Sequence, residues 1–343
     1  MITGLIIILF LVLILPFTKL VERNLEVFLF IMGIASVIVS QVFNMELLKE
    51  ALTHPINITI AVLVAGLLFR WFQNPIEETV LTVSKAMPFR LFIALFVIIL
   101  GLISSVITAI IAAIILVSVV SVLKMERKAE IRLVVIACFS IGMGAALTPI
   151  GEPLSTIVTG NLNESFFYLF NLLGIYIIPG VIIFGVFAAL VIDPKKHIKT
   201  IELNSDTAKT VSEKESYKEI VIRSLKIFLF VMALTFLGAG FQPFIERFLL
   251  DLNPLILYWI NMVSAVLDNA TLAAAEISPA MNEVTIRDIL LGLIISGGML
   301  IPGNIPNIIA AGKLKITSME YAKFAFLVGL VTMLIYFIVI LFV

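Results

Sequence analysis

Charged residues, cysteine and histidine are all scarce in this sequence. Only 13% of its 343 residues are charged, whereas soluble domains carry about a quarter. The single cysteine, Cys138, excludes an internal disulfide. The two histidines, His54 and His197, fall in polar connections, which excludes a histidine-rich metal or haem site. The formal net charge is zero; it gives no indication of a nucleic-acid partner, and we expect none.

Apolar residues are abundant instead. They make up 61% of the chain, and the mean hydropathy is +1.18. Several apolar stretches reach about 18 residues, enough to cross ~30 Å of hydrocarbon, so the sequence predicts an all-α polytopic protein of the lipid bilayer. The N-terminal stretch has no positively charged start and no A-x-A-like cleavage site, which favours a retained membrane helix over a signal peptide. Full spans are expected at residues 2–19, 25–42, 57–73, 166–192, 219–240 and 319–343.

Two regions, residues 90–163 and 254–316, do not have the pattern of simple spans. In the first, one apolar segment is interrupted at GLISSVITA and a second at ALTPIGEPLS. The second region repeats this order, with interruptions at SAVLDNATL and MLIPGNIPNIIAAGKL. A helix breaks inside a membrane only where the freed backbone groups are buried in protein or line a wet cavity. Paired interrupted segments in two halves of a chain therefore point to a transporter binding site.

The two regions can be aligned with each other. SSVITAIIAA lies over SAVLDNATLA, which pairs Thr108 with Asp268. GEPLSTIVTGNL lies over GNIPNIIAAGKL, which pairs Glu152 with Asn304. The alignment predicts an internal repeat, in which each half contains a re-entrant hairpin followed by a broken helix.

The distribution of basic residues predicts the topology. If each hairpin is re-entrant and each broken helix still crosses, only Lys49, Arg247 and Arg287 of the 23 basic residues lie on the side of the N-terminus. The positive-inside rule then makes the opposite side cytoplasmic. Both termini are predicted outside, and the hydrophilic linker at residues 193–218 is predicted to be cytoplasmic. The two hairpins enter from opposite sides, which is an inverted repeat. The membrane is expected to be a prokaryotic plasma membrane.

We expect five parts along the chain. Residues 1–89, with three membrane helices, residues 164–253 and the C-terminal helix at residues 317–343 form a scaffold. Residues 90–163 and 254–316 form the two transport repeats.

Polar residues within the repeats concentrate at the interruptions. A charge at mid-membrane is expensive, so a carboxylate there requires a reason. No Lys or Arg is placed to balance Asp268 or Glu152, and such a carboxylate either takes up a proton or binds a cation. Hydroxyl, amide and carboxylate oxygens suit Na⁺ or a proton rather than a soft metal. The candidate ion- and proton-binding residues are Asp268 and Glu152 (also the candidate Na⁺ ligands), Asn269, Thr271, Ser105, Thr108, Thr148 and Asn304; further candidates are Ser104, Ser155, Thr156, Ser264, Asn307 and Glu276.

Structural roles stay open for several of these residues. Ser104 or Ser264 alone could equally bond to its own helix or to a neighbouring one. Asp268 could cap the hairpin tip, and Glu152 could cap the second half of its broken helix. Glu276 lies eight residues, about 12 Å of helix, beyond Asp268. At that distance it could be solvated near the outer interface.

Two of the interruptions resemble motifs of the ion transporter superfamily, which includes NhaD-type sodium/proton antiporters, arsenite carriers and divalent-anion or citrate symporters. AALTPIGEP is similar to the antiporters' TPIGD break, with Glu152 in place of Asp. VLDNATLAAA is similar to their VDN motif, at Asp268 and Asn269. The resemblance implies an elevator mechanism, in which a transport domain of both hairpins and both broken helices slides against a scaffold. It also implies a homodimer, for which the apolar helices in residues 1–73 are the natural interface.

Together these observations predict a secondary active transporter and not an enzyme. The favoured reaction is cation/proton antiport, with Na⁺ exchanged for H⁺ and no cofactor beyond these transported ions. Asp268 is expected to exchange the proton and the cation, with Glu152 as the second carboxylate. The alternative is a Na⁺-coupled symporter of a small carboxylate or inorganic anion, held at half-helix N-termini. A channel, a membrane scaffold and an intramembrane aspartyl protease fit less well, since a protease would need a second Asp at depth.

Overall fold

The computed structural model describes residues 1–15, 18, 21, 24–192, 216–248, 253–266, 269–277 and 281–342. Every regular element in these residues is a helix. In chain order they are α1 (Ile2–Ile14), α3 (Leu25–Ser40), α4 (Met45–Ala86), α5 (Phe89–Ile107), α6 (Ala109–Leu123), α7 (Arg127–Ala145), α8 (Pro153–Leu162), α9 (Tyr168–Val191), α11 (Tyr217–Phe248), α12 (Pro254–Ile260), η2 (Asn261–Ala265), α13 (Asn269–Glu276), α14 (Glu283–Ser296), η3 (Ile301–Gly303), α15 (Ile305–Leu314) and α16 (Ser318–Phe342).

Four of the described helices are long and apolar enough to cross a membrane: α5, α9, the part of α11 from Tyr217 to Phe244, and α16. Their length and composition confirm a multi-pass helical membrane protein. Three of them coincide with expected spans, at residues 166–192, 219–240 and 319–343. α1 and α3 contain shorter apolar helices, and the span expected at 57–73 lies inside the 42-residue α4. α5, expected as one arm of a hairpin, is itself long enough to cross.

Local sequence sets several helix boundaries. The side chain of Asn44 accepts a hydrogen bond from the backbone N–H of Leu47 at the start of α4, and Asn282 accepts one from Thr285 at the start of α14. These side chains satisfy N–H groups that have no partner within the helix. α8 and α12 instead begin with a proline, whose missing N–H would be unpaired at that position anyway.

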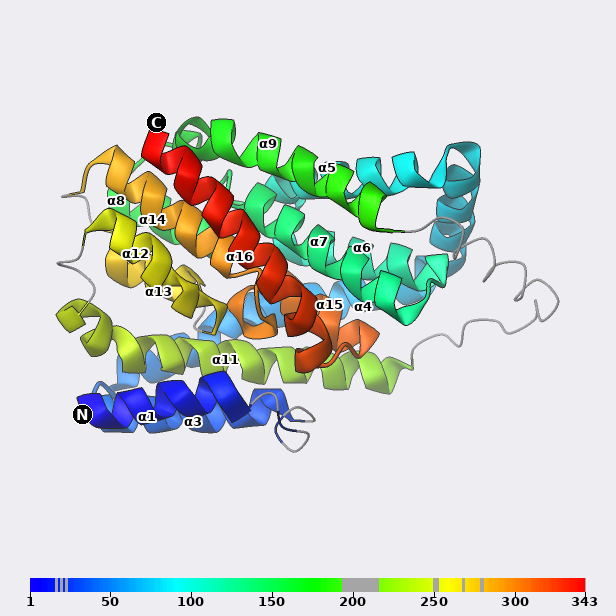
Figure 1. Ribbon diagram of the computed structural model, residues 1–343. Coiled ribbons are helices and arrows are strands. Elements are labelled where there is room, and N and C mark those ends of the chain that lie inside the picture. The colour runs from blue at the N-terminus through cyan, green and yellow to red at the C-terminus, as the bar shows by residue number, and fades with distance from the viewer. Residues whose placement is uncertain are drawn as a thin grey trace.

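The helices form two groups, which meet where α4 packs on α6 and α11 packs on α13. α11 packs mainly against α3 and α4, and α1 packs against α3. In the second group α9 packs on α5 and α7, while α16 packs on α14 and α7. In Figure 1, α1, α3 and α11 lie together along one side of the molecule. α9 and α16, assigned to the scaffold on sequence, therefore pack with helices of the interrupted regions.

The two interrupted regions run in opposite directions. Figure 1 shows both chain termini at one end of the molecule, and α12 and α14 begin at that end. α5 and α7 begin at the other end, where α9 also finishes and α11 starts.

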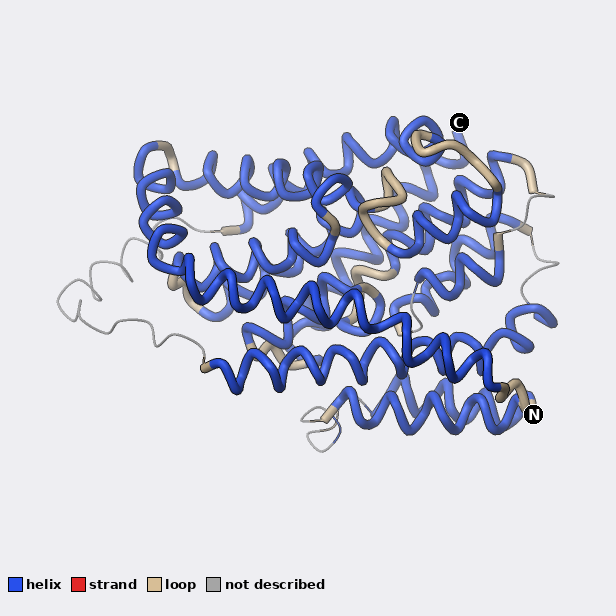
Figure 2. Tube along the Cα trace, turned by 180° about the vertical axis from the view of Figure 1, so that it is seen from behind, coloured by secondary structure: helices blue, strands red, loops and turns tan. Residues whose placement is uncertain are grey.

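The helix breaks lie inside the protein. Figure 2 shows loop segments within the bundle as well as at its ends. Ala146 and Leu147, which follow α7, are buried, and so is all of η3 between α14 and α15. By contrast, α9 and α16 expose large apolar side chains such as Ile175, Leu190 and Leu327. An exposed apolar surface of this kind suits a hydrocarbon environment.

Candidate functional site

The first break separates α7 from α8 by a turn that is buried except at Pro149 and Ile150. Leu147 N–H donates to the carbonyl of Gly144 at 3.1 Å, and Gly151 N–H donates to that of Thr148 at 3.1 Å. A Cβ at Gly151 would overlap the carbonyl of Ala145, so only glycine lets the chain fold back this closely. These contacts end one helix and lead directly into the start of the next.

The tip of the first hairpin is fixed to this break. Thr108 joins α5 to α6 with φ of 75°, a backbone region that a β-branched residue rarely adopts. Next to it, Ala109 N–H donates to the carbonyl of Gly151 at 2.8 Å. The hydroxyl of Thr148 in turn donates to the carbonyl of Ser105. Two hydrogen bonds, one in each direction, therefore tie the hairpin to the broken helix.

Glu152 directly precedes α8, at the N-cap position, and is buried, with 5% of its surface exposed. Its backbone is extended, and its side chain makes no capping hydrogen bond. The alternative role as a helix cap is therefore not what this structure shows.

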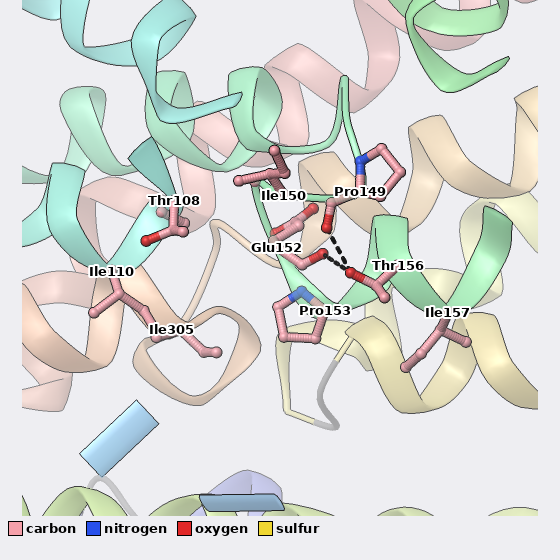
Figure 3. Close-up of a pocket in the computed structure, with 11 residues that line it drawn as sticks. Thr108, Ile110, Pro149, Ile150, Glu152, Pro153, Thr156, Ile157 and Ile305 are labelled. Carbon is pink, nitrogen blue, oxygen red and sulfur yellow. Dashed lines mark hydrogen bonds between the residues drawn. The ribbon is translucent and has the colours of Figure 1, made fainter. Parts of the chain in front are cut away.

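A cavity of about 430 Å³ lies beside Glu152. Its lining includes Thr108 from the hairpin tip, Pro149 and Thr156 from the break, and Ile305 from the start of α15 (Figure 3). The cavity thus joins the first hairpin, the first break and the second broken helix at one carboxylate.

Most hydroxyl groups at the first break bond to backbone carbonyls. Ser104 donates to Gly101 in its own helix and to Ile141 in α7, at 2.6 and 2.9 Å. Three others donate likewise: Ser105 to Leu102, Ser155 to Ala146 and Thr156 to Pro149. For Ser104 both structural roles left open by the sequence are thus realised together.

The second break is lined by buried amides. Asn304 directly precedes α15, at the N-cap position, with an extended backbone, and its side chain makes no capping hydrogen bond. Asn307 donates from Nδ2 to the carbonyls of Gly297 and Leu300, at 2.8 and 2.9 Å. These carbonyls were freed where α14 ends. Asn269, at the start of α13, is buried beside Gly297, and its Nδ2 has no hydrogen-bond partner among the described residues.

The two broken helices contact each other directly. A Cβ at Gly142 of α7 would lie 2.7 Å from Nδ2 of Asn304, so the glycine is what admits the amide. The second hairpin also packs on its own break, since a Cβ at Gly303 would lie 2.9 Å from the Cα of Ala265 in η2.

Three predicted site residues are not placed. Asp268 lies outside the described residues, and so do the side chains of Ser264 and Thr271. The proposed exchange at Asp268 and its alternative as a hairpin cap both stay predictions.

Two buried charged groups differ from expectation. Glu276 is only 1% exposed, so the alternative that it is solvated near the interface is wrong. α14 carries a buried ion pair that the sequence reasoning missed: Arg287 Nε lies 2.8 Å from Asp288 Oδ1. Arg287 also donates to the hydroxyl of Tyr176 on α9. The adjacent opposite charges at 287 and 288 were the available signal, because a neutralised pair can be buried.

The chemistry of the site is that of oxygen donors. Among the described residues no three His, Cys, Asp or Glu side chains come together in a way that could hold a metal ion. The groups that do meet are carboxylate, hydroxyl, amide and backbone carbonyl oxygens, which suit hard cations and protons.

Comparison with known proteins places the chain in a family. No curated protein matches it at a significant level. The family described as "Protein of unknown function (DUF1646)" matches residues 2–343, essentially the full length, and the chain belongs to this family.

Proposed function

We propose that the protein is a secondary active transporter that exchanges a cation, with Na⁺ favoured, for protons. The observation that carries the proposal is the position of Glu152. It is a buried carboxylate at the start of a half-helix, beside a cavity that elements of both interrupted regions enclose. A helix interruption that lines a cavity inside a membrane protein is the usual form of a transporter binding site.

Exchange follows from the chemistry of a buried carboxylate. Such a group is stable when it carries a proton or when it holds a cation, and the two compete. Glu152 and Asp268 are the two exchanging carboxylates in the proposal. Neutral oxygens come from Ser105, Thr108, Thr148, Asn269, Thr271 and Asn304.

An inverted repeat underlies the proposed movement. In its support, α8 and α15 each contain 10 residues and begin after an extended residue, Glu152 or Asn304, whose side chain makes no cap. Both end at a left-handed residue, Asn163 or Lys315. The opposite directions of the two regions in Figure 1 agree with this symmetry.

We propose an elevator mechanism with a mobile body larger than the two repeats alone. Because α9 and α16 pack on α5, α7 and α14, they would move with the hairpins and broken helices. α1, α3, α4 and α11 would form the static scaffold and, through residues 1–73, the interface of a homodimer. The protein would lie in a prokaryotic plasma membrane, with both termini outside and residues 193–218 in the cytoplasm.

Transport by reconstituted protein tests the proposal. Proteoliposomes with a lumenal pH dye would receive pulses of Na⁺, Li⁺ and K⁺, with charge movement followed on a solid-supported membrane. The variants are Asp268→Asn, Glu152→Gln and, as a matched control, Glu164→Gln. Glu164 is exposed, two residues past the end of α8, so its loss should leave transport unchanged.

We expect a cation-triggered pH change in wild type and in Glu164→Gln, and a signal at the level of empty vesicles in the other two variants. Silence until a dicarboxylate is added with Na⁺ would make the protein a symporter. Wild-type cation/proton exchange in Glu152→Gln would refute the proposed role of Glu152 as an exchanging carboxylate.

A further inference from the structure

A buried polar pair joins the second hairpin to itself, away from the cavity. Asn261, the first residue of η2, and Glu276, the last of α13, are each 1% exposed. Asn261 Nδ2 donates to Glu276 Oε2 at 3.0 Å. The hydroxyl of Ser296 on α14 donates to the carbonyl of Asn261 at 2.7 Å, which fixes the backbone that carries the amide.

One oxygen of each partner is left over. Oε1 of Glu276 and Oδ1 of Asn261 are buried, and neither has a hydrogen-bond partner among the described residues. Both atoms are acceptors when the carboxyl group is ionised, so neither can satisfy the other. Buried acceptors without a donor are destabilising. These two acceptor oxygens belong to the carboxyl group and the amide that already share one hydrogen bond.

A single added proton gives both of these oxygens a hydrogen-bond partner. A protonated carboxyl group has one O–H donor, and placed on Oε1 it can donate to Asn261 Oδ1. The amide N–H continues to donate to Oε2, so the acid and the amide form a closed pair with two hydrogen bonds. No third group is required.

We propose that Glu276 is a proton-binding site, with its neutral carboxyl group paired to the amide of Asn261 by two hydrogen bonds. The elements packed against α13 supply no competing partner in the described residues. η2 has no charged residue, and Glu152 stands at the start of α8. On α14, Glu283 is exposed and Arg287 pairs with Asp288.

The fourth neighbour, α11, carries its charges toward its two ends. They are Lys218, Glu219, Arg223, Lys226, Glu246 and Arg247. The one hydrogen bond found for Glu276 in the described part of the chain is that from Asn261. An ionised Glu276 would therefore be a buried charge without a cation, which is the unfavourable form.

The site also has a place in transport, a consequence that rests on the proposed function. α13 packs against α8, the helix that Glu152 directly precedes. During the proposed cation/proton exchange, the proton on Glu276 would move with the same mobile body as Glu152, the carboxylate beside the cavity.

Infrared spectroscopy of the full chain in lipid nanodiscs tests the site without requiring transport. A protonated carboxyl group has a C=O stretch separate from the carboxylate bands. We expect Glu276→Gln to remove the intensity of one such group at neutral pH. The control Glu283→Gln changes an exposed glutamate and should remove none. Asn261→Ala should shift the band, because the pair is broken. An unchanged band in Glu276→Gln would refute the protonated carboxyl.

Thermal unfolding separates a proton from a bound cation. Glutamine places an N–H where the proton is proposed, so Glu276→Gln should keep the wild-type midpoint while Glu276→Ala lowers it. Equal destabilisation of both variants would overturn the proposal. A bound cation would also overturn it. In that case the unfolding midpoint of wild type would rise with Na⁺ but not with choline, and the midpoint of Glu276→Gln would not respond to Na⁺. If antiport is absent but the Glu276 band is present, the proton site is retained and the proposed function is rejected. If antiport is present but the band is absent, the proposed function is retained and the proton site is rejected.

Discussion

The two interrupted regions carry their buried acids in different places. In the first region the buried carboxylate Glu152 directly precedes α8, and the hairpin tip is the neutral Thr108. In the second the neutral Asn304 directly precedes α15, and the buried carboxylates of the described residues are Glu276 at the end of α13 and Asp288 on α14. The residues that precede α8 and α15 therefore differ in charge, although each of the two helices has 10 residues.

The largest effect is expected from making the breaks alike in charge. Asn304→Asp places a carboxylate at a position that is 4% exposed, opposite Gly142. A buried charge without compensation costs about 3 kcal/mol or more, so the unfolding temperature in detergent should fall well below that of wild type. Asn304→Leu, which adds no charge, is the control. Equal loss in both variants would show that the amide, and not the absence of charge, is what the second break needs.

The contact between the breaks should be sensitive to a single methyl group. Gly142→Ala puts a Cβ 2.7 Å from Asn304 Nδ2, and overpacking of this kind costs about 1–3 kcal/mol. Gly160→Ala in α8 is a matched control, because nothing lies within 4 Å of its added Cβ. It should be neutral or stabilising by up to about 1 kcal/mol. Equal denaturation midpoints for the two variants would contradict the close approach.

The ends of the two half-helices differ as well. α8 finishes with backbone bonds from Asn163 to the carbonyls of Gly160 and Thr159. The end of α15 is also held by Arg127, which donates to the carbonyls of Leu314 and Lys315 at 3.0 and 2.7 Å.

Arg127 also forms a two-pronged pair with Glu320 at the start of α16. Arg127→Ala should cost about 1–2 kcal/mol, since the side chain is partly exposed and the pair is screened. Arg127→Lys keeps the charge but loses the fork, and should recover less than half of that loss. If Arg127→Lys had the same urea midpoint as wild type, the contribution of Arg127 would come from its charge alone and not from the geometry of its two hydrogen bonds.

The smallest effect concerns the first hairpin tip. Thr108 has φ of 75° and ψ of 148°, a conformation that costs a non-glycine residue about 1–3 kcal/mol. Thr108→Gly should therefore stabilise the fold by about 1 kcal/mol after the loss of the 3.4 Å bond from Ile111 N–H to the threonine hydroxyl. A lower unfolding temperature in this variant would mean that the hydroxyl group outweighs the backbone strain.

The sequence by itself determined the membrane class and the positions of the interruptions. Long apolar runs and the scarcity of charge leave few other folds, and proline and glycine mark helix ends through backbone geometry that is local. The stretch GEPLSTIVTGNL and its counterpart GNIPNIIAAGKL thus coincide with α8 and α15 and the residues just before them.

Only the tertiary structure decided which polar groups meet. The burial of Glu276, its pairing with Asn261 and the contact of Asn304 with Gly142 join residues far apart in the chain. The grouping of α9 and α16 with the interrupted regions is of the same kind. Hydropathy along a sequence shows that a residue is in the membrane, but it does not show which side chains it faces, because that depends on how separate helices pack.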